Sequence, residues 1–164
     1  MRLLFAHGLE SGPEGRKTSW LRGAGHDVRA PDCRGLELSV RIEILIAALA
    51  DEAVPRVLVG SSFGGIAGLA AAIFAARAGH GPRALLLCAP ALGLVLPARF
   101  ATPLVPPCPA AVVHGRRDEI IPVEVGRRWA MQHGAAWFEC DDDHSLTASA
   151  EIVLDALAKL VPED

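Results

Sequence analysis

The chain has 164 residues, a length that favours one domain able to bury about 70% of the surface of the unfolded chain. Hydrophobic residues make up 51% of the sequence, which excludes an intrinsically disordered protein. The formal net charge of −3 provides no basic face and argues against a nucleic-acid partner. We therefore expect a single globular domain over residues 1–164.

Two further features bear on the cellular compartment. The longest apolar runs, residues 44–50 and 66–76, are too short to span a membrane, and the first residues lack the length of a signal sequence. The four cysteines are scattered without a C-x-x-C pair, so free thiols are expected rather than disulfides. These features predict a cytosolic protein. The cysteines are Cys33, Cys88, Cys108 and Cys140.

Short apolar runs alternate with stretches of helical spacing along the whole chain. Strands are expected at residues 2–6, 26–30, 56–59, 84–89, 110–114 and 136–138. Helices are expected at residues 17–24, from about 36 to 53, from 64 to the turn residues 79–82, from 122 to 132, and from 146 to 160. The stretch 90–109 is expected to be irregular, and most of its side chains are apolar.

A few residues mark where these helices begin and end. Gly25 follows the first helix as its C′ glycine, and Pro122 suits the first turn of the fourth helix. The second helix begins either at a cap formed by Ser39 or earlier, near Gly35. Helix boundaries are therefore expected within a few residues of these positions.

The alternation of strands and helices predicts the fold class. Most of the strands are continuous apolar runs, as expected when both faces of a parallel sheet are covered by helices. We therefore expect an α/β fold, a three-layer α/β/α sandwich around a mostly parallel six-stranded sheet. In such sheets the chemistry lies beyond the carboxyl ends of the strands, so the loops that follow the strands are the ones to inspect.

The loop after the third strand carries the strongest motif. Gly60-Ser61-Ser62-Phe63-Gly64 fits G-x-S-x-G and lies between an apolar strand and an apolar helix, which is the context that a nucleophile elbow requires. The two glycines remove side chains that would clash in so sharp a turn. The turn places Ser62 at its apex, near the N-terminus of the following helix, where backbone N–H groups can stabilise an oxyanion.

Two other interpretations of the same five residues compete with the elbow. The glycines of a tight strand-to-helix turn can serve close packing alone. A phosphate-binding loop is disfavoured, because no Gly-Lys-Ser/Thr follows at the required spacing. Ser61, the neighbouring hydroxyl, lies on the wrong side of the turn for a nucleophile and is expected to be structural.

Three more strand-end loops carry chemically useful side chains. His7-Gly8-Leu9 follows the first strand, Asp118 follows the fifth, and His144 follows the sixth. A serine hydrolase needs a nucleophile, a histidine that takes its proton and a carboxylate that holds the histidine in the right tautomer. The chain order of Ser62, Asp118 and His144 is the one found in α/β-hydrolases.

Taken together, these segments give the chain a resemblance to a small, nearly lidless α/β-hydrolase, similar to the YqiA-like esterases. The resemblance covers almost the whole chain and implies a parallel sheet with strand order 2-1-3-4-5-6. It also implies that the N-terminal antiparallel strands are missing and that the cap is reduced to 90–109. The matching segments are Phe5-Ala6-His7-Gly8, 60–65, 113–122 and Asp143-His144.

Each proposed member of the triad has a competitor. The loop after the fourth strand contains no carboxylate, so the acid is expected after the fifth strand, where the resemblance favours Asp118 over Glu119. As the base, His144 competes with three other histidines. The resemblance implies structural roles for two of them, and the third lies at a helix end, where a cation is favourable. The three competing histidines are His7, His114 and His133.

The oxyanion hole is expected to consist of backbone N–H groups. One belongs to Phe63, the residue after the nucleophile, and the other is best placed at Leu9 in the first loop. Substrate binding is assigned to Leu92, Leu94 and Leu96. The segment 90–109 that contains these leucines forms an acyl pocket, covers the sheet edge, or contacts a second copy of the chain in a homo-oligomer.

Asp141, Asp142 and Asp143 stand beside Cys140 and His144, a composition that can also hold a metal ion. No second cluster with zinc-like spacing accompanies them, so a solvated turn is the expected structure. We expect neither a metal nor another cofactor.

These observations predict a cytosolic serine hydrolase of the carboxylesterase or thioesterase type. Its substrate would be a small-molecule acyl ester or thioester, cleaved through an acyl-enzyme intermediate, and the reduced cap predicts a shallow site. The alternative is a protein of the same fold that acts mainly as a protein-binding module with little turnover. A peptidase or a hydrolase of carbon–carbon bonds would use the same residues.

Overall fold

A computed structural model describes residues 1–51 and 56–161. The strands are β1 (Arg2–Ala6), β2 (Asp27–Arg29), β3 (Val57–Ser61), β4 (Ala84–Cys88), β5 (Ala110–Gly115) and β6 (Ala136–Cys140). The helices are α1 (Arg16–Gly23), α2 (Leu38–Ala50), α3 (Phe63–Arg77), α4 (Val123–His133) and α5 (Ala150–Leu160), and a single 3₁₀ turn, η1, covers Ala98–Phe100. No helix in the described ranges is long and apolar enough to cross a membrane.

The strands form one parallel sheet in the order β2-β1-β3-β4-β5-β6. Each strand pairs in register with its neighbours; Leu4 of β1, for example, lies opposite Leu58 of β3. The order reverses between β1 and β3, so the loops after these two strands diverge to opposite faces of the sheet and open a crevice between them. The predicted fold class and strand order are confirmed.

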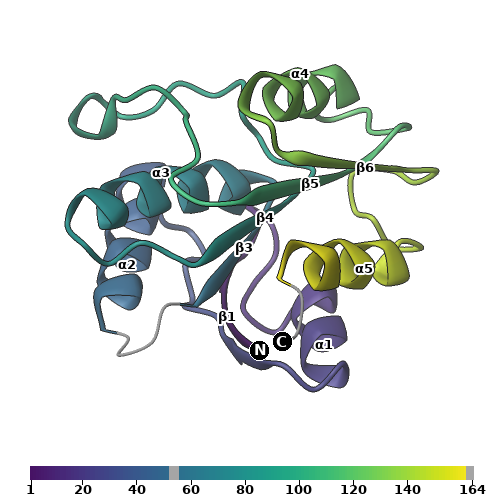
Figure 1. Cartoon of the computed structure of the whole chain (residues 1–164), viewed down its shortest axis with the longest axis horizontal. Coiled ribbons are helices and arrows are strands. Elements are labelled where there is room, and N and C mark those ends of the chain that lie inside the picture. The colour runs from purple at the N-terminus through teal and green to yellow at the C-terminus, as the bar shows by residue number, and fades with distance from the viewer. Residues whose placement is uncertain (52–55, 162–164) are drawn as a thin grey trace.

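Helices cover both faces of the sheet (Figure 1). Alternate strand residues point to opposite faces, so Leu4 and Leu58 pack with α2, α3 and α4, whereas Leu3 and Val59 pack with α1 and α5. Helix α3 is buried on almost every side between the sheet and α2, which explains why its sequence is apolar all round. The chain therefore has two hydrophobic clusters, one on each side of the sheet.

Several element boundaries differ from the sequence-based prediction. Glu37, not Ser39, is the N-cap of α2, and Pro122 precedes α4 as its N-cap instead of lying in the first turn. Helix α5 begins at Ala150 rather than Leu146, because Leu146 has φ 56° and interrupts a helical path. The expected end of the second helix, near 53, lies outside the described residues. Gly25 has φ 82° after α1, as a C′ glycine should.

The segment 90–109 is irregular apart from η1, as predicted. It lies over the face of the sheet that carries α3 and α4. The ring of Phe100 meets that of Phe74 edge to face at 5.2 Å, and Trp129 Nε1 donates a hydrogen bond to the carbonyl of Leu104 at 2.7 Å. Apolar contacts and few hydrogen bonds therefore hold this segment in place.

The four cysteines are free. Burial raises the pKa of the Cys88 thiol and of the Cys108 thiol to about 11. Both thiols are therefore protonated at neutral pH, and neither is a reactive nucleophile.

Candidate active site

The turn between β3 and α3 is a strained elbow. Ser62, between the last residue of the strand and the first of the helix, has φ 54° and ψ −117°, a conformation that residues with side chains rarely adopt. A Cβ on Gly64 would lie 2.1 Å from the carbonyl oxygen of Ala6, and one on Gly60 would lie 2.7 Å from that of Gly64. The close approach of these backbones requires both glycines and holds Ser62 at the apex.

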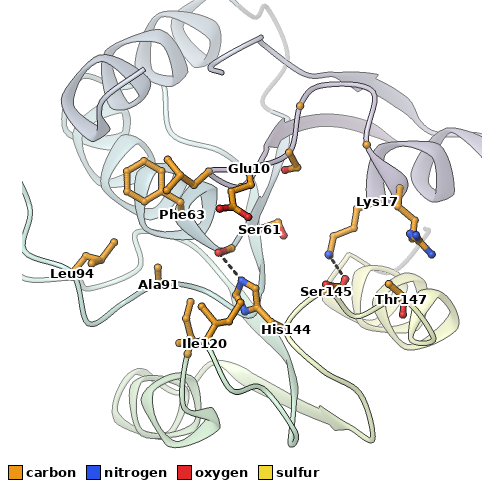
Figure 2. Close-up of a pocket in the computed structure, with 18 of the residues that line it drawn as sticks. Glu10, Lys17, Ser61, Phe63, Ala91, Leu94, Ile120, His144, Ser145 and Thr147 are labelled. Atoms are coloured by element: carbon orange, nitrogen blue, oxygen red, sulfur yellow. Dashed lines mark hydrogen bonds between the residues drawn. The ribbon is translucent and has the colours of Figure 1, made fainter. Parts of the chain in front are cut away.

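Ser62, His144 and Asp118 form one hydrogen-bonded chain. His144 Nε2 lies 2.9 Å from Ser62 Oγ, the contact drawn as a dashed line to His144 in Figure 2. His144 Nδ1 lies 2.7 Å from Asp118 Oδ2. Because an ionised carboxylate only accepts hydrogen bonds, Nδ1 is the donor, which leaves the lone pair of Nε2 facing the hydroxyl. The structure brings together the three side chains that the sequence singled out.

The carboxylate of Asp118 is fully buried and held on both oxygens. Oδ1 accepts hydrogen bonds from the N–H groups of Ile120 and Ile121 at 2.9 and 2.8 Å. Oδ2 accepts from His114 Nε2 at 3.1 Å as well as from His144. Glu119, the competing acid, is exposed to solvent. The neighbouring loop therefore orients Asp118 toward His144 before any substrate binds.

His114 and His7 are both buried, and each forms hydrogen bonds to the backbone. His114 Nε2 also lies 3.1 Å from the carbonyl of Ile121, so this nitrogen carries the proton. His7 Nε2 accepts the N–H of Cys33 at 2.9 Å, and burial lowers the pKa of His7 below its ordinary value. Neither ring contacts Ser62 among the described hydrogen bonds. His133 lies at the end of α4, beside the ring of Trp129.

The loop that carries His144 is built around Asp142. Oδ1 of Asp142 accepts the N–H of Asp143, and Oδ2 accepts the N–H of Ala148 and the hydroxyl of Ser149, each at 2.8 Å. Burial alone would raise the pKa of Asp142, but these hydrogen bonds outweigh it, and the pKa lies below its ordinary value. The expectation of a solvated turn is wrong for this residue, because only 4% of Asp142 is exposed.

The other two carboxylates of the same run have separate partners. Asp141 pairs with Arg116 and Arg117 at the surface, and Asp143 accepts the N–H of Ser145 at 2.8 Å. Within the described residues, no group of three or more His, Cys, Asp or Glu side chains is arranged to hold a metal ion. The acidic run therefore shapes the histidine loop.

The two residues expected to supply the oxyanion donors both belong to segments next to Ser62. Phe63 is the first residue of α3, where backbone N–H groups have no partner within the helix. Leu9 belongs to the loop after β1, whose Gly8 lies against Ser62: a Cβ on Gly8 would be 3.6 Å from Cβ of Ser62. Both residues line the same cavity as Ser62 and His144.

Arg41 of α2 holds this side of the site, although no motif in the sequence points to it. Its side chain is buried, and its Nη1 donates to the carbonyls of His7 and Gly8 at 3.1 and 3.2 Å. Its guanidinium lies 5.0 Å from the centre of the Phe63 ring. One cation thus contacts both segments that carry the expected oxyanion donors.

Comparison with solved structures identifies the fold. A protein from Xanthomonas campestris pv. campestris, assigned to the hydrolases of the α/β superfamily, is 27% identical, with a TM-score of 0.78 over 97% of this chain and 96% of that one. Est1E from Butyrivibrio proteoclasticus is 18% identical, with a TM-score of 0.77 over 99% and 88%. An α/β serine hydrolase without a lid, from Xanthomonas campestris, is 18% identical, with a TM-score of 0.70 over 99% and 83%.

The chain belongs to the α/β-hydrolase superfamily. Its structural neighbours are named as hydrolases and esterases, which supports an enzyme of the hydrolase class. No family model and no curated protein matches its sequence. A small form without a lid agrees with the short segment 90–109.

The crevice of this α/β-hydrolase holds a cavity of about 750 Å³ beside Ser62 and His144. This volume lies within the usual range of small-molecule sites. Of the three leucines assigned to substrate binding, Leu94 lines the cavity. Leu92 and Leu96 do not line this cavity and pack against the hydrophobic cluster around α3. Of the segment 90–109, only Ala91, Gly93 and Leu94 are among the cavity-lining residues, and the irregular backbone follows no sequence period that would single them out.

Proposed function

We propose that this α/β-hydrolase is a carboxylesterase or thioesterase that cleaves an acyl ester with Ser62 as the nucleophile. The observation that carries the proposal is the unbroken chain of hydrogen bonds from Ser62 Oγ through His144 to the buried carboxylate of Asp118. A hydroxyl within 2.9 Å of a histidine nitrogen whose other nitrogen is held by a carboxylate has the geometry of an activated nucleophile.

The first half of the reaction acylates the enzyme. Ser62 Oγ attacks the carbonyl carbon while His144 Nε2 takes the hydroxyl proton, and Asp118 stabilises the imidazolium that forms. The N–H groups of Phe63 and Leu9 bind the oxyanion, and the loss of one such donor costs on the order of 3 kcal/mol in related enzymes. His144 then gives its proton to the alcohol or thiol as the bond from the carbonyl carbon to that leaving group breaks.

The second half restores the enzyme. A water molecule attacks the carbonyl of the acyl-enzyme, and His144 Nε2 takes a proton from it. The bond between the acyl carbon and Ser62 Oγ breaks, His144 returns the proton to Ser62, and the carboxylic acid leaves. Every proton transfer uses the side chains of the chain and water.

The cavity favours a small-molecule substrate with an apolar part. Phe63, Leu94 and Ile120 line one side of it, and 46% of Leu94 and 71% of Ile120 remain exposed at its rim. An acyl chain lying against these side chains would bury apolar surface worth about 25 cal/mol per Å². The volume also admits substrates larger than the small or exposed acyl groups expected from the reduced cap.

The proposal is tested with p-nitrophenyl esters of two to eight acyl carbons and with a matching acyl thioester. Wild type should hydrolyse at least one series, and Ser62→Ala should lose about 10³-fold or more in kcat while keeping its far-UV circular dichroism. Ser61→Ala is the control, because it removes the neighbouring hydroxyl and should keep at least about a tenth of the activity. A folded wild type that hydrolyses no ester, or an active Ser62→Ala, contradicts the proposal.

A further inference from the structure

The two sides of the cavity differ in chemistry, with the Ser62–His144 pair between them. In Figure 2, Phe63, Leu94 and Ala91 lie to the left of His144, and Lys17, Ser145 and Thr147 lie to its right. Arg16 also lines the cavity. One side is therefore apolar, and the other carries two cations and two hydroxyls.

Lys17 is the most enclosed of these polar groups. Its Nζ donates a hydrogen bond to the backbone carbonyl of Ser145 at 2.7 Å (Figure 2). An ammonium has three donors, so this neutral acceptor uses one of them. Burial lowers the pKa of Lys17 below its ordinary value, which means that the surroundings compensate the charge incompletely.

Neither Lys17 nor Arg16 forms an ion pair with any residue that the structure describes. Other cations of the chain do pair, as Arg22 does with Glu14, Arg34 with Asp32 and Arg127 with Glu139. Asp142 and Asp143 are the carboxylates whose negative charge acts on Lys17. Both already accept hydrogen bonds from N–H groups of their own loop.

Glu10 is the one carboxylate among the cavity-lining residues, against the two cations Arg16 and Lys17. It is exposed, and in Figure 2 it lies above His144, whereas Lys17 lies to the right. The polar side of the cavity consequently has an excess of positive charge and unused donors. A partly desolvated ammonium of this kind gains most from an anionic ligand.

We propose that the substrate of this enzyme carries an anionic group, a carboxylate or a phosphate, that binds to Lys17 and Arg16 while its apolar part lies against Phe63, Leu94 and Ile120. The inference rests on the proposed function, because it places the ester bond at Ser62. The hydroxyls of Ser145 and Thr147 supply further donors on the same side. A lysine and an arginine suit either anion. If the acyl chain lies against the apolar side, the anion belongs to the leaving group; if the acyl chain lies on the polar side, the anion belongs to the acyl group.

Two sets of esters separate these cases. The first compares the p-nitrophenyl monoester of glutaric acid with its neutral methyl ester, which places the charge on the acyl side. The second compares butanoyl esters of 4-hydroxybenzoate, of 4-hydroxyphenyl phosphate and of the neutral 4-hydroxybenzamide, which places a carboxylate or a phosphate on the leaving-group side. The kcat/KM of each ester is measured for wild type and for each variant, so that intrinsic reactivity cancels in the ratio.

Lys17→Met should lower kcat/KM about 10- to 100-fold for the anionic members of at least one set and about 2-fold or less for the neutral members. Lys17→Arg should retain the preference, and Arg16→Met should reduce it less than Lys17→Met does. Lys159→Met is the matched control, because Lys159 pairs with Asp155 on α5 and does not line the cavity. It should leave every ester unchanged.

The remaining outcomes overturn the inference. An equal loss on anionic and neutral esters in Lys17→Met would make Lys17 a support of the His144 loop. No preference for either anion in wild type would also contradict the proposal, although hydrolysis of the neutral esters would leave the esterase function standing. If wild type hydrolyses none of these esters but cleaves the p-nitrophenyl series or the thioester, the inference fails alone. If it cleaves none of the substrates, the proposed function fails, and the inference fails with it.

Discussion

The loops that carry Ser62, Asp118 and His144 differ from the segment 90–109 in how they are held. Buried polar groups fix the first set: Asp142 accepts three hydrogen bonds inside the His144 loop, and Arg41 ties the loop after β1 to Phe63. The segment 90–109 is held mainly by apolar packing and lends few side chains to the cavity. Directed hydrogen bonds therefore position the reacting groups, whereas non-directional apolar contacts hold the segment 90–109.

The largest expected effect is that of a single methyl group at the elbow. In Gly64→Ala the new Cβ would lie 2.1 Å from the carbonyl oxygen of Ala6, so the variant should lose more than about 4 kcal/mol of unfolding free energy or fail to fold. Gly93→Ala is the matched change in 90–109, where no atom lies within 4 Å, and it should shift stability by less than about 0.5 kcal/mol. Urea unfolding measures the free energy of unfolding of both variants. Equal losses would show that the elbow is no more tightly packed than the segment 90–109.

Removal of the buried cation behind the elbow should rank second. Arg41→Met removes the arginine donor from the buried carbonyls of His7 and Gly8, of which Gly8 keeps the His7 Nδ1 donor. This loss should cost about 3 kcal/mol of unfolding free energy and lower kcat more than KM changes. Arg99→Met removes an exposed arginine of 90–109 that pairs with Glu43, and such pairs contribute at most about 1 kcal/mol. Unchanged kcat in a folded Arg41→Met would show that the loop after β1 holds its geometry without the cation.

The third largest effect is expected for Asp142→Asn. This variant should lose about 2 kcal/mol of unfolding free energy at neutral pH, because an amide N–H₂ would replace one of the carboxylate acceptors. The pKa of Asp142 is lower in the folded protein than its ordinary value of 3.8. Its contribution is therefore complete above that value and is lost as the pH falls through the folded-state pKa. The stability difference between wild type and variant should narrow below pH 3.8.

The neighbouring carboxylate supplies the control for this pH dependence. Asp141 pairs with Arg116 and Arg117 at the surface, so Asp141→Asn should change stability by less than about 1 kcal/mol at any pH. A stability difference for Asp142→Asn that stays constant down to pH 2, measured by thermal unfolding, would mean that the charge of Asp142 contributes nothing.

The smallest effect on activity is expected at Leu94, the leucine of the segment 90–109 that lines the cavity. Leu94→Ala should lower kcat/KM about 5-fold for medium-chain esters and leave the acetate ester unchanged, because only the longer chain reaches the apolar side of the cavity. Val95→Ala, at a side chain that is 91% exposed and does not line the cavity, should change neither. An equal loss on all chain lengths in Leu94→Ala would instead indicate that Leu94 supports the backbone of 90–109.

Local signals explain what the sequence could predict. The apolar strand, the two glycines of the elbow and the following apolar helix are adjacent in the chain, so the turn at Ser62 could be predicted from a short window. Asp118 and His144 could be found because each follows a strand whose carboxyl end meets the same edge of a parallel sheet. The expectations of one domain and a cytosolic location stay predictions.

The missed features depend on contacts between distant segments. The sequence predicts that Arg41 is an exposed residue of an amphipathic helix. Its hydrogen bonds to the carbonyls of His7 and Gly8 join segments 34 and 33 residues apart, which no local pattern predicts. Lys17 faces the cavity only because α1 packs beside the His144 loop. The start of α5 was misjudged because Asp142 captures the N–H of Ala148 and the hydroxyl of Ser149, which turns residues that look helical into a loop.

Labelling with a fluorophosphonate probe is the most direct test of whether Ser62 is an activated nucleophile. The probe phosphonylates a serine only where the hydroxyl is activated, so it reports the assembly of Ser62 with His144 and Asp118 without knowledge of the substrate. We predict labelling of wild type at Ser62, shown by mass spectrometry of the modified peptide, and none in Ser62→Ala or His144→Ala. A folded wild type that resists the probe, or a label on another serine, would show that Ser62, His144 and Asp118 do not act as a triad.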